Sequence, residues 1–296
     1  HPSHTGGMAL LDHWYRLIGS TRAPLLHIAA DQGAGPATVL VHGIASTAAT
    51  FAEVLPLLED RRAISIELLG FGQSPAGTDY TPAEHVAALR RTIKHAKPRK
   101  PYTLVGHSLG SLLSARYAVE HWRELDRLIL VGPPLYLPED AIENPIQRFA
   151  TGLYRQAYEF MVENQSFTLA GAGQISKLFP PGVFEITEDN WDAFRHSLTN
   201  CIVQQTLVED VRWLAAKGLP IEVIYGSQDE FLPFGAIDAL EAIEGVTVQR
   251  ISWARHQIGK RLARALVARL QGGDIDPDDP ADRHEGDRAE TEDTRA

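Results

Sequence analysis

A chain of 296 residues with 44% hydrophobic and 22% charged residues has enough apolar side chains for one large or two smaller globular domains. Its single cysteine, Cys201, excludes a framework of internal disulfides, and we expect it to be a structural thiol. The net charge of −10, without a basic stripe interleaved with aromatic residues, argues against nucleic-acid binding. No apolar stretch is long enough for a transmembrane helix, so no membrane span is expected.

The start of the chain is polar and carries no secretory signal, which favours a cytoplasmic protein. Residues 1–8 are interpreted as an added leader up to a native Met8, with a processed end as the alternative. A removed signal peptide is also compatible with this start. The apolar spacing over residues 9–18 then predicts an amphipathic helix.

Strand-like and helix-like segments alternate from there to residue 131. Strands are predicted at residues 25–29, 38–41, 63–67, 102–105 and 128–131, and helices at 47–59, 82–96 and 109–122. This alternation predicts an α/β fold with a mostly parallel, doubly wound sheet. Active sites of such sheets lie at the carboxyl ends of the strands.

The strand at residues 38–41 is followed by His42 and Gly43. Gly43 lets the backbone approach a substrate closely, and the N–H of Ile44 is the predicted donor to a developing oxyanion. A second donor is expected from Leu109. The alternative is an ordinary turn that ends a strand.

Residues 106–110 read Gly-His-Ser-Leu-Gly, a G-x-S-x-G pattern between a strand and a helix. This setting is typical of a nucleophile elbow, which exposes Ser108 at the tip of a sharp turn. Gly106 and Gly110 are expected to prevent collisions in that turn, with His107 in support. The alternative is a helix cap built from small residues.

A serine in such an elbow is followed along the chain by a catalytic acid and then by a histidine, and this sequence offers both. Asp229 comes just after a predicted strand at residues 221–225, and His256 follows another at 246–251. We therefore predict a triad of Ser108, Asp229 and His256. Glu230 is the competing acid, and His256 has the alternative role of capping a last helix predicted at residues 257–270.

The segment at residues 135–212 is helical in pattern, shows no strand, and is predicted to be a lid. It divides the core into residues 9–134 and 213–271, and it contains ten aromatic residues. Those aromatic residues not needed for packing would line an apolar pocket above Ser108. We expect a small apolar or aromatic acyl substrate. The candidates for binding an anionic substrate are Arg148, Arg155 and Arg195.

Residues 272–296 contain ten acidic residues and three arginines, and no aromatic residue. This composition predicts a disordered acidic tail. The tail accounts for −7 of the net charge of −10, which leaves about −3 for the rest of the chain. A solvated terminus is the favoured interpretation over an interaction tail.

The chain resembles the α/β-hydrolase superfamily. The resemblance rests on residues 41–44, the Gly-Phe-Gly-Gln-Ser run at 70–74, the elbow at 106–110, residues 226–229 and His256. It implies a sheet of about eight strands with helices on both faces and a lid inserted after the sixth strand. It also implies that Ser108, Asp229 and His256 are catalytic and that the N–H groups of Ile44 and Leu109 form the oxyanion hole.

The sequence departs from the family pattern at three positions. Glu67 stands where relatives often have Asp, Ser111 replaces a frequent glycine, and Arg255 replaces the usual glycine before the histidine. None of the three removes a catalytic atom. The serine nucleophile argues against the haloalkane dehalogenase and epoxide hydrolase branches, which use an aspartate at that position.

The sequence therefore predicts a serine esterase that acts through an acyl-enzyme. No cofactor is expected, since no phosphate loop or dinucleotide fingerprint is present, and no metal, since no histidine or cysteine spacing suits one. The same triad leaves C–C bond hydrolase, lactonase and cofactor-free perhydrolase chemistry open. A ligand receptor or binding protein with a hydrolase fold is the non-enzyme alternative. The oligomeric state is left open.

Overall fold

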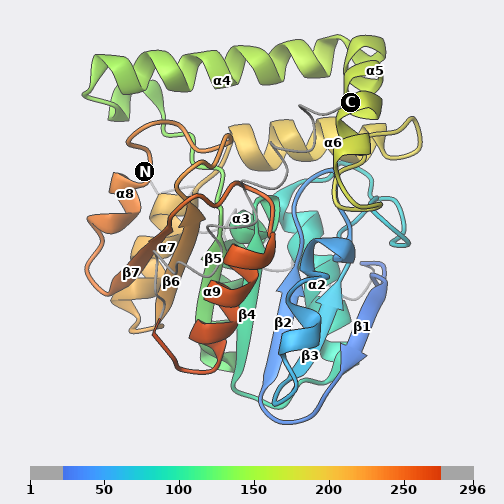
Figure 1. Ribbon diagram of the computed structural model, residues 1–296, viewed down its shortest axis with the longest axis vertical. Helices are drawn as coiled ribbons and strands as arrows, with labels where there is room; N and C mark the ends of the chain where they lie inside the picture. The colour runs from blue at the N-terminus through green and yellow to red at the C-terminus, as the bar shows by residue number, and fades with distance from the viewer. Residues whose placement is uncertain (1–22, 275–296) are drawn as a thin grey trace, which may run out of the picture.

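A mostly parallel β-sheet forms the centre of the protein, in a computed structural model that describes residues 23–274 (Figure 1). Within that range its seven strands lie in the order β1-β3-β2-β4-β5-β6-β7, and only β1 runs antiparallel to its neighbour. The strands are β1 (Ile28–Gln32), β2 (Ala37–Val41), β3 (Arg62–Ile66), β4 (Tyr102–His107), β5 (Leu125–Val131), β6 (Ile221–Gly226) and β7 (Val246–Ile251).

The predicted α/β class with a mostly parallel sheet is confirmed. The described residues contain seven strands where the resemblance implied about eight, and the inserted segment follows β5, the fifth strand in this range. Residues 1–8, the predicted helix at 9–18 and most of the predicted acidic tail (275–296) lie outside the described residues.

Eight α-helices occur in the described range. They are α2 (Pro82–Ala96), α3 (Leu109–His121), α4 (Pro145–Glu163), α5 (Gln165–Ile175), α6 (Trp191–Ser197), α7 (Leu207–Ala216), α8 (Asp238–Glu241) and α9 (Lys260–Leu270). Short 3₁₀ helices lie at Ala48–Phe51, Leu55–Leu57, Trp122–Glu124, Glu139–Ala141 and Ser176–Leu178, and a π-helix at Leu198–Val203 continues α6.

Capping residues in the sequence set the starts of two long helices. The Thr81 side chain accepts a hydrogen bond from the N–H of Glu84 at the start of α2, and Asn144 caps α4 in the same way. A proline follows each cap, where its missing N–H costs no hydrogen bond.

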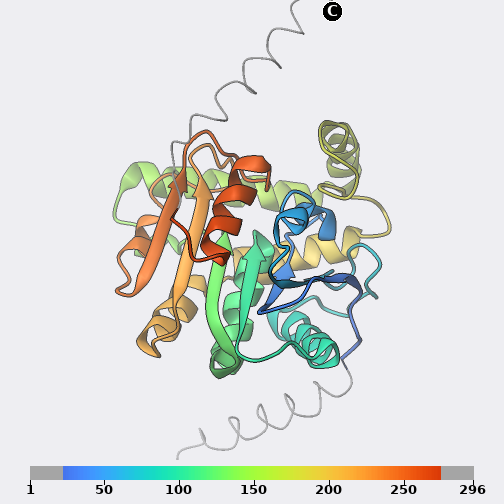
Figure 2. The same cartoon turned by 60° about the horizontal axis from the view of Figure 1, so that its bottom comes forward.

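The alternation of side chains along the strands divides the core between the two faces of the sheet. In β2, Val39 and Val41 belong to the larger apolar cluster, whereas Leu40 belongs to the smaller one. Figure 2 shows α9 on one face and α2, α3 and α7 on the other. Both faces are therefore covered by helices, as a parallel sheet requires.

The segment between β5 and β6 lies partly beyond the sheet. Figure 1 shows α4 and α5 past one end of the strands, with α6 between α4 and the sheet. By contrast, α7 packs on α3 through buried Val211 and Leu214, and an ion pair of 2.8 Å joins Arg116 to Asp210. The boundary predicted at residue 212 thus falls inside α7, which packs on α3.

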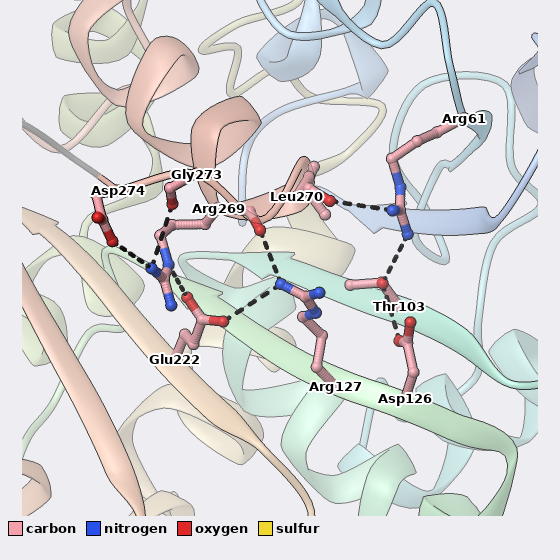
Figure 3. Close-up of polar contacts among 9 residues, drawn as sticks. All are labelled: Arg61, Thr103, Asp126, Arg127, Glu222, Arg269, Leu270, Gly273 and Asp274. Atoms are coloured by element: carbon pink, nitrogen blue, oxygen red, sulfur yellow. Dashed lines mark hydrogen bonds and ion pairs between the residues drawn. The ribbon is translucent and has the colours of Figure 1, made fainter.

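A polar network joins the end of α9 to the amino ends of the strands (Figure 3). The buried Arg61 guanidinium donates hydrogen bonds to Thr38 Oγ1 (2.7 Å), Thr103 Oγ1 (2.9 Å) and the Leu270 carbonyl oxygen (3.0 Å). Arg127 in turn donates to the Arg269 carbonyl oxygen at 2.7 Å. These bonds fix the carboxyl end of α9 to the amino ends of the strands.

Candidate active site

Ser108 lies in a sharp turn between β4 and α3 with a strained backbone. Its φ of 53° and ψ of −123° are rarely adopted by residues other than glycine. A Cβ atom added at Gly106 would lie 2.2 Å from the Gly110 carbonyl oxygen, and one added at Gly110 would lie 2.2 Å from that of Val41. Only glycine fits at these two positions, so the Gly-x-Ser-x-Gly spacing is a steric requirement of the turn.

Asp229 and His256 meet at the carboxyl ends of β6 and β7. The Nδ1 atom of His256 lies 2.9 and 3.0 Å from the two carboxylate oxygens of Asp229, and both side chains are buried. Burial acts to raise the pKa of Asp229, but His256 and the Phe231 N–H outweigh it and hold that pKa below its usual value. The carboxylate therefore fixes the tautomer in which Nδ1 carries the proton and Nε2 is free to act as a base.

His107 connects Ser108 to His256. Its Nε2 atom lies 2.9 Å from the His256 carbonyl oxygen, and the two imidazole rings are 5.0 Å apart between centroids. Burial, with a smaller contribution from His256, lowers the pKa of His107 to about 3. The ring is therefore neutral and donates Nε2–H to that carbonyl, which brings the elbow and the histidine loop together.

Gly132, directly after β5, adjoins the same pair of side chains. A Cβ atom there would lie 3.1 Å from Asp229 Oδ2 and 3.4 Å from His256 Nδ1, and the residue has a φ of +51°. Sequence analysis did not single out this glycine. Its position next to a proline pair gave no signal of contact with Asp229.

The backbone of the β2 loop approaches the elbow closely at Gly43. A Cβ atom at Gly43 would lie 2.8 Å from Ser108 Cβ and 3.3 Å from Ser108 Oγ. His42 Nδ1 lies 2.7 Å from the Gly43 carbonyl oxygen, and His42 Nε2 accepts a hydrogen bond from the Leu68 N–H at 2.9 Å. Because a trans peptide directs its N–H opposite to its C=O, the Ile44 N–H points away from His42.

Glu67, which departs from the family pattern, holds this loop through hydrogen bonds to its carboxylate. Its carboxylate accepts hydrogen bonds from the N–H groups of Gln73 (2.7 Å) and Ala48 (3.3 Å) and contacts His27 Nδ1 at 2.9 Å. Burial acts to raise its pKa, but these donors together lower it. The glutamate thus remains an ionised acceptor that fastens the loops after β2 and β3 to each other.

Glu230, the competing acid, contacts the main chain of His256 and not its ring. Its Oε2 accepts a hydrogen bond from the His256 N–H at 3.2 Å. Sequence analysis missed Phe231, whose ring packs against the His256 ring with centroids 4.8 Å apart. A phenylalanine two residues after an aspartate in a turn gives no sequence signal of that contact.

The other predictions from the sequence concern Cys201, metal binding and membrane spans. Cys201 is buried and donates weakly to the Tyr80 carbonyl oxygen at 3.3 Å, and burial raises the pKa of its thiol to about 12. Within residues 23–274, no cluster of three or more histidine, cysteine or carboxylate side chains is arranged to hold a metal. Over the same range, no helix is both long and apolar enough to cross a membrane.

Comparison with protein families identifies the family of the fold. A family model described as the alpha/beta hydrolase fold matches residues 36–171, which include the β2 loop, the elbow and β5. The chain belongs to the α/β-hydrolase superfamily.

Among curated relatives of this superfamily, the probable lysophospholipase BODYGUARD 3 of Arabidopsis thaliana is 35% identical over 105 residues. The match spans 33% of this chain and 21% of that relative, so the chain covers about a fifth of the relative's length. Probable lysophospholipase BODYGUARD 1 of the same plant is 34% identical over 114 residues, or 36% and 24% of the two chains.

Solved structures share the fold at low identity. A lipase-esterase related protein from Clostridium acetobutylicum superposes with a TM-score of 0.62 at 17% identity, covering 84% of this chain and 99% of that one. A meta-cleavage product hydrolase from Pseudomonas fluorescens gives a TM-score of 0.56 at 18% identity, covering 82% and 93%. These solved structures therefore share the fold of most of this chain.

Proposed function

We propose that this α/β hydrolase cleaves a carboxylic ester, or a related acyl compound, through a covalent acyl-enzyme on Ser108. The observation that carries the proposal is the buried Asp229–His256 contact of 2.9 Å beside a strained serine turn. A strained backbone and a buried carboxylate–imidazole pair both cost stability, and they persist where the chemistry of a site uses them.

In this mechanism His256 Nε2 removes the proton from Ser108 Oγ as the oxygen attacks the acyl carbon. The resulting imidazolium is stabilised by the buried Asp229 carboxylate, which also holds the ring in place. His256 then returns the proton to the leaving alcohol. In the second half, His256 activates water, which releases the acid and restores Ser108.

The N–H groups of Ile44 and Leu109 hold the oxyanion. Leu109 begins α3 directly after Ser108, so its N–H is one of the helix donors that lack an intrahelical acceptor. The hydrogen bond from His42 to the Gly43 carbonyl turns the Ile44 N–H away from His42. Removing one such donor from a comparable site costs about 10²–10³ in kcat.

The ester bond is the favoured target because of the names of the curated relatives. A lysophospholipase cleaves a carboxylic ester, and BODYGUARD 3, which matches a third of this chain, is named as a probable lysophospholipase. The helical segment at residues 135–212 acts in this proposal as the lid that selects the acyl group.

Hydrolysis of short p-nitrophenyl esters tests the proposal directly. We expect multiple turnover by the native chain and none above background by Ser108→Ala at an unchanged melting temperature. A fluorophosphonate should modify Ser108, identified by peptide mass spectrometry. Tight ligand binding without turnover or labelling would instead support a binding protein, and full activity of folded Ser108→Ala would refute the mechanism.

A further inference from the structure

Three tyrosines of the inserted segment surround the loop that carries Asp229. Tyr136 lies between β5 and α4, and Tyr154 and Tyr158 lie four residues apart on α4, so both face the same side of that helix. The Tyr136 ring packs against the Tyr154 ring at 5.6 Å and the Tyr158 ring at 5.3 Å between centroids. We call these residues the tyrosine cluster.

The cluster holds two consecutive carbonyl groups of the acid loop. The Tyr136 hydroxyl donates a hydrogen bond to the Phe231 carbonyl oxygen at 2.6 Å, and the Tyr154 hydroxyl donates to the Glu230 carbonyl oxygen at 2.8 Å. A tyrosine hydroxyl has one proton to donate, so the Tyr136 oxygen is left to accept from the Tyr158 hydroxyl, its other partner. The cluster is thus a directed chain of donors from α4 to the loop.

The carbonyl groups held in this way belong to residues that contact both members of the acid–base pair. The Phe231 N–H donates to Asp229 Oδ1 at 2.9 Å, and the Phe231 ring packs edge-on against the His256 ring at 4.8 Å. The Glu230 carboxylate accepts the His256 N–H. A shift of this loop would therefore move the Asp229 carboxylate and the surface against which His256 packs.

We propose that Tyr136 and Tyr154 are positioning residues that hold the Asp229–His256 pair in register through the carbonyl groups of Phe231 and Glu230. The inference rests on the proposed function, in which that pair activates Ser108. Tyr136 is buried and Tyr154 partly so, and burial raises the pKa of both hydroxyls, so both remain protonated donors. The inserted segment then contributes to the reaction by orienting the acid as well as by covering the substrate.

Tyr136→Phe and Tyr154→Phe test the proposal, because each removes one hydroxyl and keeps the ring. We expect Tyr136→Phe to lower kcat about tenfold with little change in KM, and Tyr154→Phe to act in the same direction with a smaller effect. A looser carboxylate–imidazole contact stabilises the imidazolium less, so the acidic limb of the pH–kcat/KM profile should move to lower pH. The ionisable side chains that face His256 (Asp229, Glu230 and His107) are unchanged in both variants.

Tyr102→Phe is the matched control. Its hydroxyl lies 2.8 Å from that of Tyr117 in a buried pair at the start of β4, away from Asp229. We expect this variant to lose thermal stability without a change in kcat or in the pH profile. If Tyr136→Phe behaves as Tyr102→Phe does, the tyrosine cluster is merely structural and the proposal is refuted.

A measurement without substrate separates this proposal from the proposed function. The Nδ1 proton of His256, shared with Asp229, should give a downfield proton resonance, which we expect to broaden or move upfield in Tyr136→Phe and to stay in place in Tyr102→Phe. This result would support the positioning role even if no ester were hydrolysed. An unchanged resonance in folded Tyr136→Phe would overturn it, whatever the activity of the native chain.

Discussion

The Nε2 atom of His107 lies 2.9 Å from the main-chain carbonyl oxygen of His256, so the residue before the proposed nucleophile holds the loop of the proposed base. Both residues are buried, and the hydrogen bond joins segments 149 positions apart in the sequence. The distance between Ser108 and His256 therefore depends on the residue before Ser108 as well as on the sheet.

His107→Gln and His107→Leu should separate this hydrogen bond from simple packing. The glutamine amide places a donor near the position of the imidazole Nε2, so we expect it to keep kcat within about fivefold of the native value. Leucine offers no donor and leaves a buried carbonyl unpaired, and we expect kcat to fall about 10-fold to 100-fold. Steady-state kinetics on both variants, with thermal melts to establish folding, measure the difference; equal activities would rule out a role for the hydrogen bond.

Asp229→Asn should reduce kcat by about 10³–10⁴-fold, because the amide no longer stabilises the imidazolium and favours the wrong tautomer. The matched variant is Glu230→Gln, which changes the adjacent carboxylate in the same way. Glu230 contacts only the His256 main chain, so we expect a loss of less than about tenfold. Comparison of kcat at the optimum pH decides between them, and a dead Glu230→Gln beside an active Asp229→Asn would reverse the assignment.

Replacement of the glycines of the site by alanine should have effects that depend on which atoms the added methyl group would contact. At Gly110 it would lie 2.2 Å from a backbone oxygen, so we expect Gly110→Ala not to fold. At Gly43 it would lie 2.8 Å from the Ser108 side chain, and we expect a folded protein with kcat reduced about 100-fold.

Gly152→Ala is the control for this series. Gly152 lies within α4, and a methyl group there would meet nothing within 4 Å. Alanine should therefore stabilise the helix by about 0.5–1 kcal/mol with unchanged kcat. Urea unfolding and ester kinetics measure both quantities, and a fully active Gly43→Ala would contradict the close approach between the β2 loop and the elbow.

Much of the site could be predicted because each proposed catalytic residue follows a strand. Parallel strands end at one edge of the sheet, so Ser108, Asp229 and His256 are brought to that edge by the strand pattern alone. Gly106 and Gly110 provided a second signal, because the turn leaves no room for a side chain at either position.

The contacts made by the inserted segment could not be predicted in the same way. The bond between Tyr136 and the Phe231 carbonyl joins residues 95 positions apart and involves a main-chain oxygen, which no residue type reveals. Glu67 likewise gave no sign of its acceptor role, because its three partners come from separate loops. Helix packing beyond the sheet depends on tertiary fit, and periodicity says only that the segment is helical.

Three buried histidines, together with the partly buried His121, should make the protein sensitive to mild acid. Burial lowers the pKa of His42, His85 and His121 to about 4 and that of His107 to about 3, from an ordinary value of 6.5. At pH values between the lowered pKa of each histidine and 6.5, the unfolded chain binds more protons than the folded one. The free energy of unfolding should therefore fall as pH is lowered from about 6.5 towards 4, by up to about 1.4 kcal/mol per pH unit for each histidine.

Urea unfolding between pH 7.5 and 4.5 measures this slope. The Nε2 atom of His85 lies 3.1 Å from Ser197 Oγ, so His85→Gln keeps a hydrogen-bonding group and removes one titrating residue. We expect this variant to show a shallower dependence on pH than the native chain. Stability that stays constant from pH 7.5 to 5 would contradict the burial of these histidines.

Substrate selection should favour neutral acyl chains over anionic ones. Of the three arginines that could anchor an anion from the inserted segment, Arg195 is paired with the Asp192 carboxylate, whereas Arg148 and Arg155 donate to the main-chain carbonyl groups of Ile142 and Leu137. An anionic acyl group would lose its hydration on binding, and one of these guanidinium groups would have to turn from its present partner to compensate that loss.

Each methylene that finds room in an apolar site should gain up to about 0.8 kcal/mol, so kcat/KM should rise with acyl length until the site is full. The test compares neutral p-nitrophenyl esters of increasing chain length with one dicarboxylic half-ester of matched length. We expect the half-ester to react at least about tenfold more slowly than its neutral counterpart. A clear preference for the half-ester would mean that an arginine leaves its partner to bind substrate, and Arg155→Met, Arg148→Met and Arg195→Met would then identify which one.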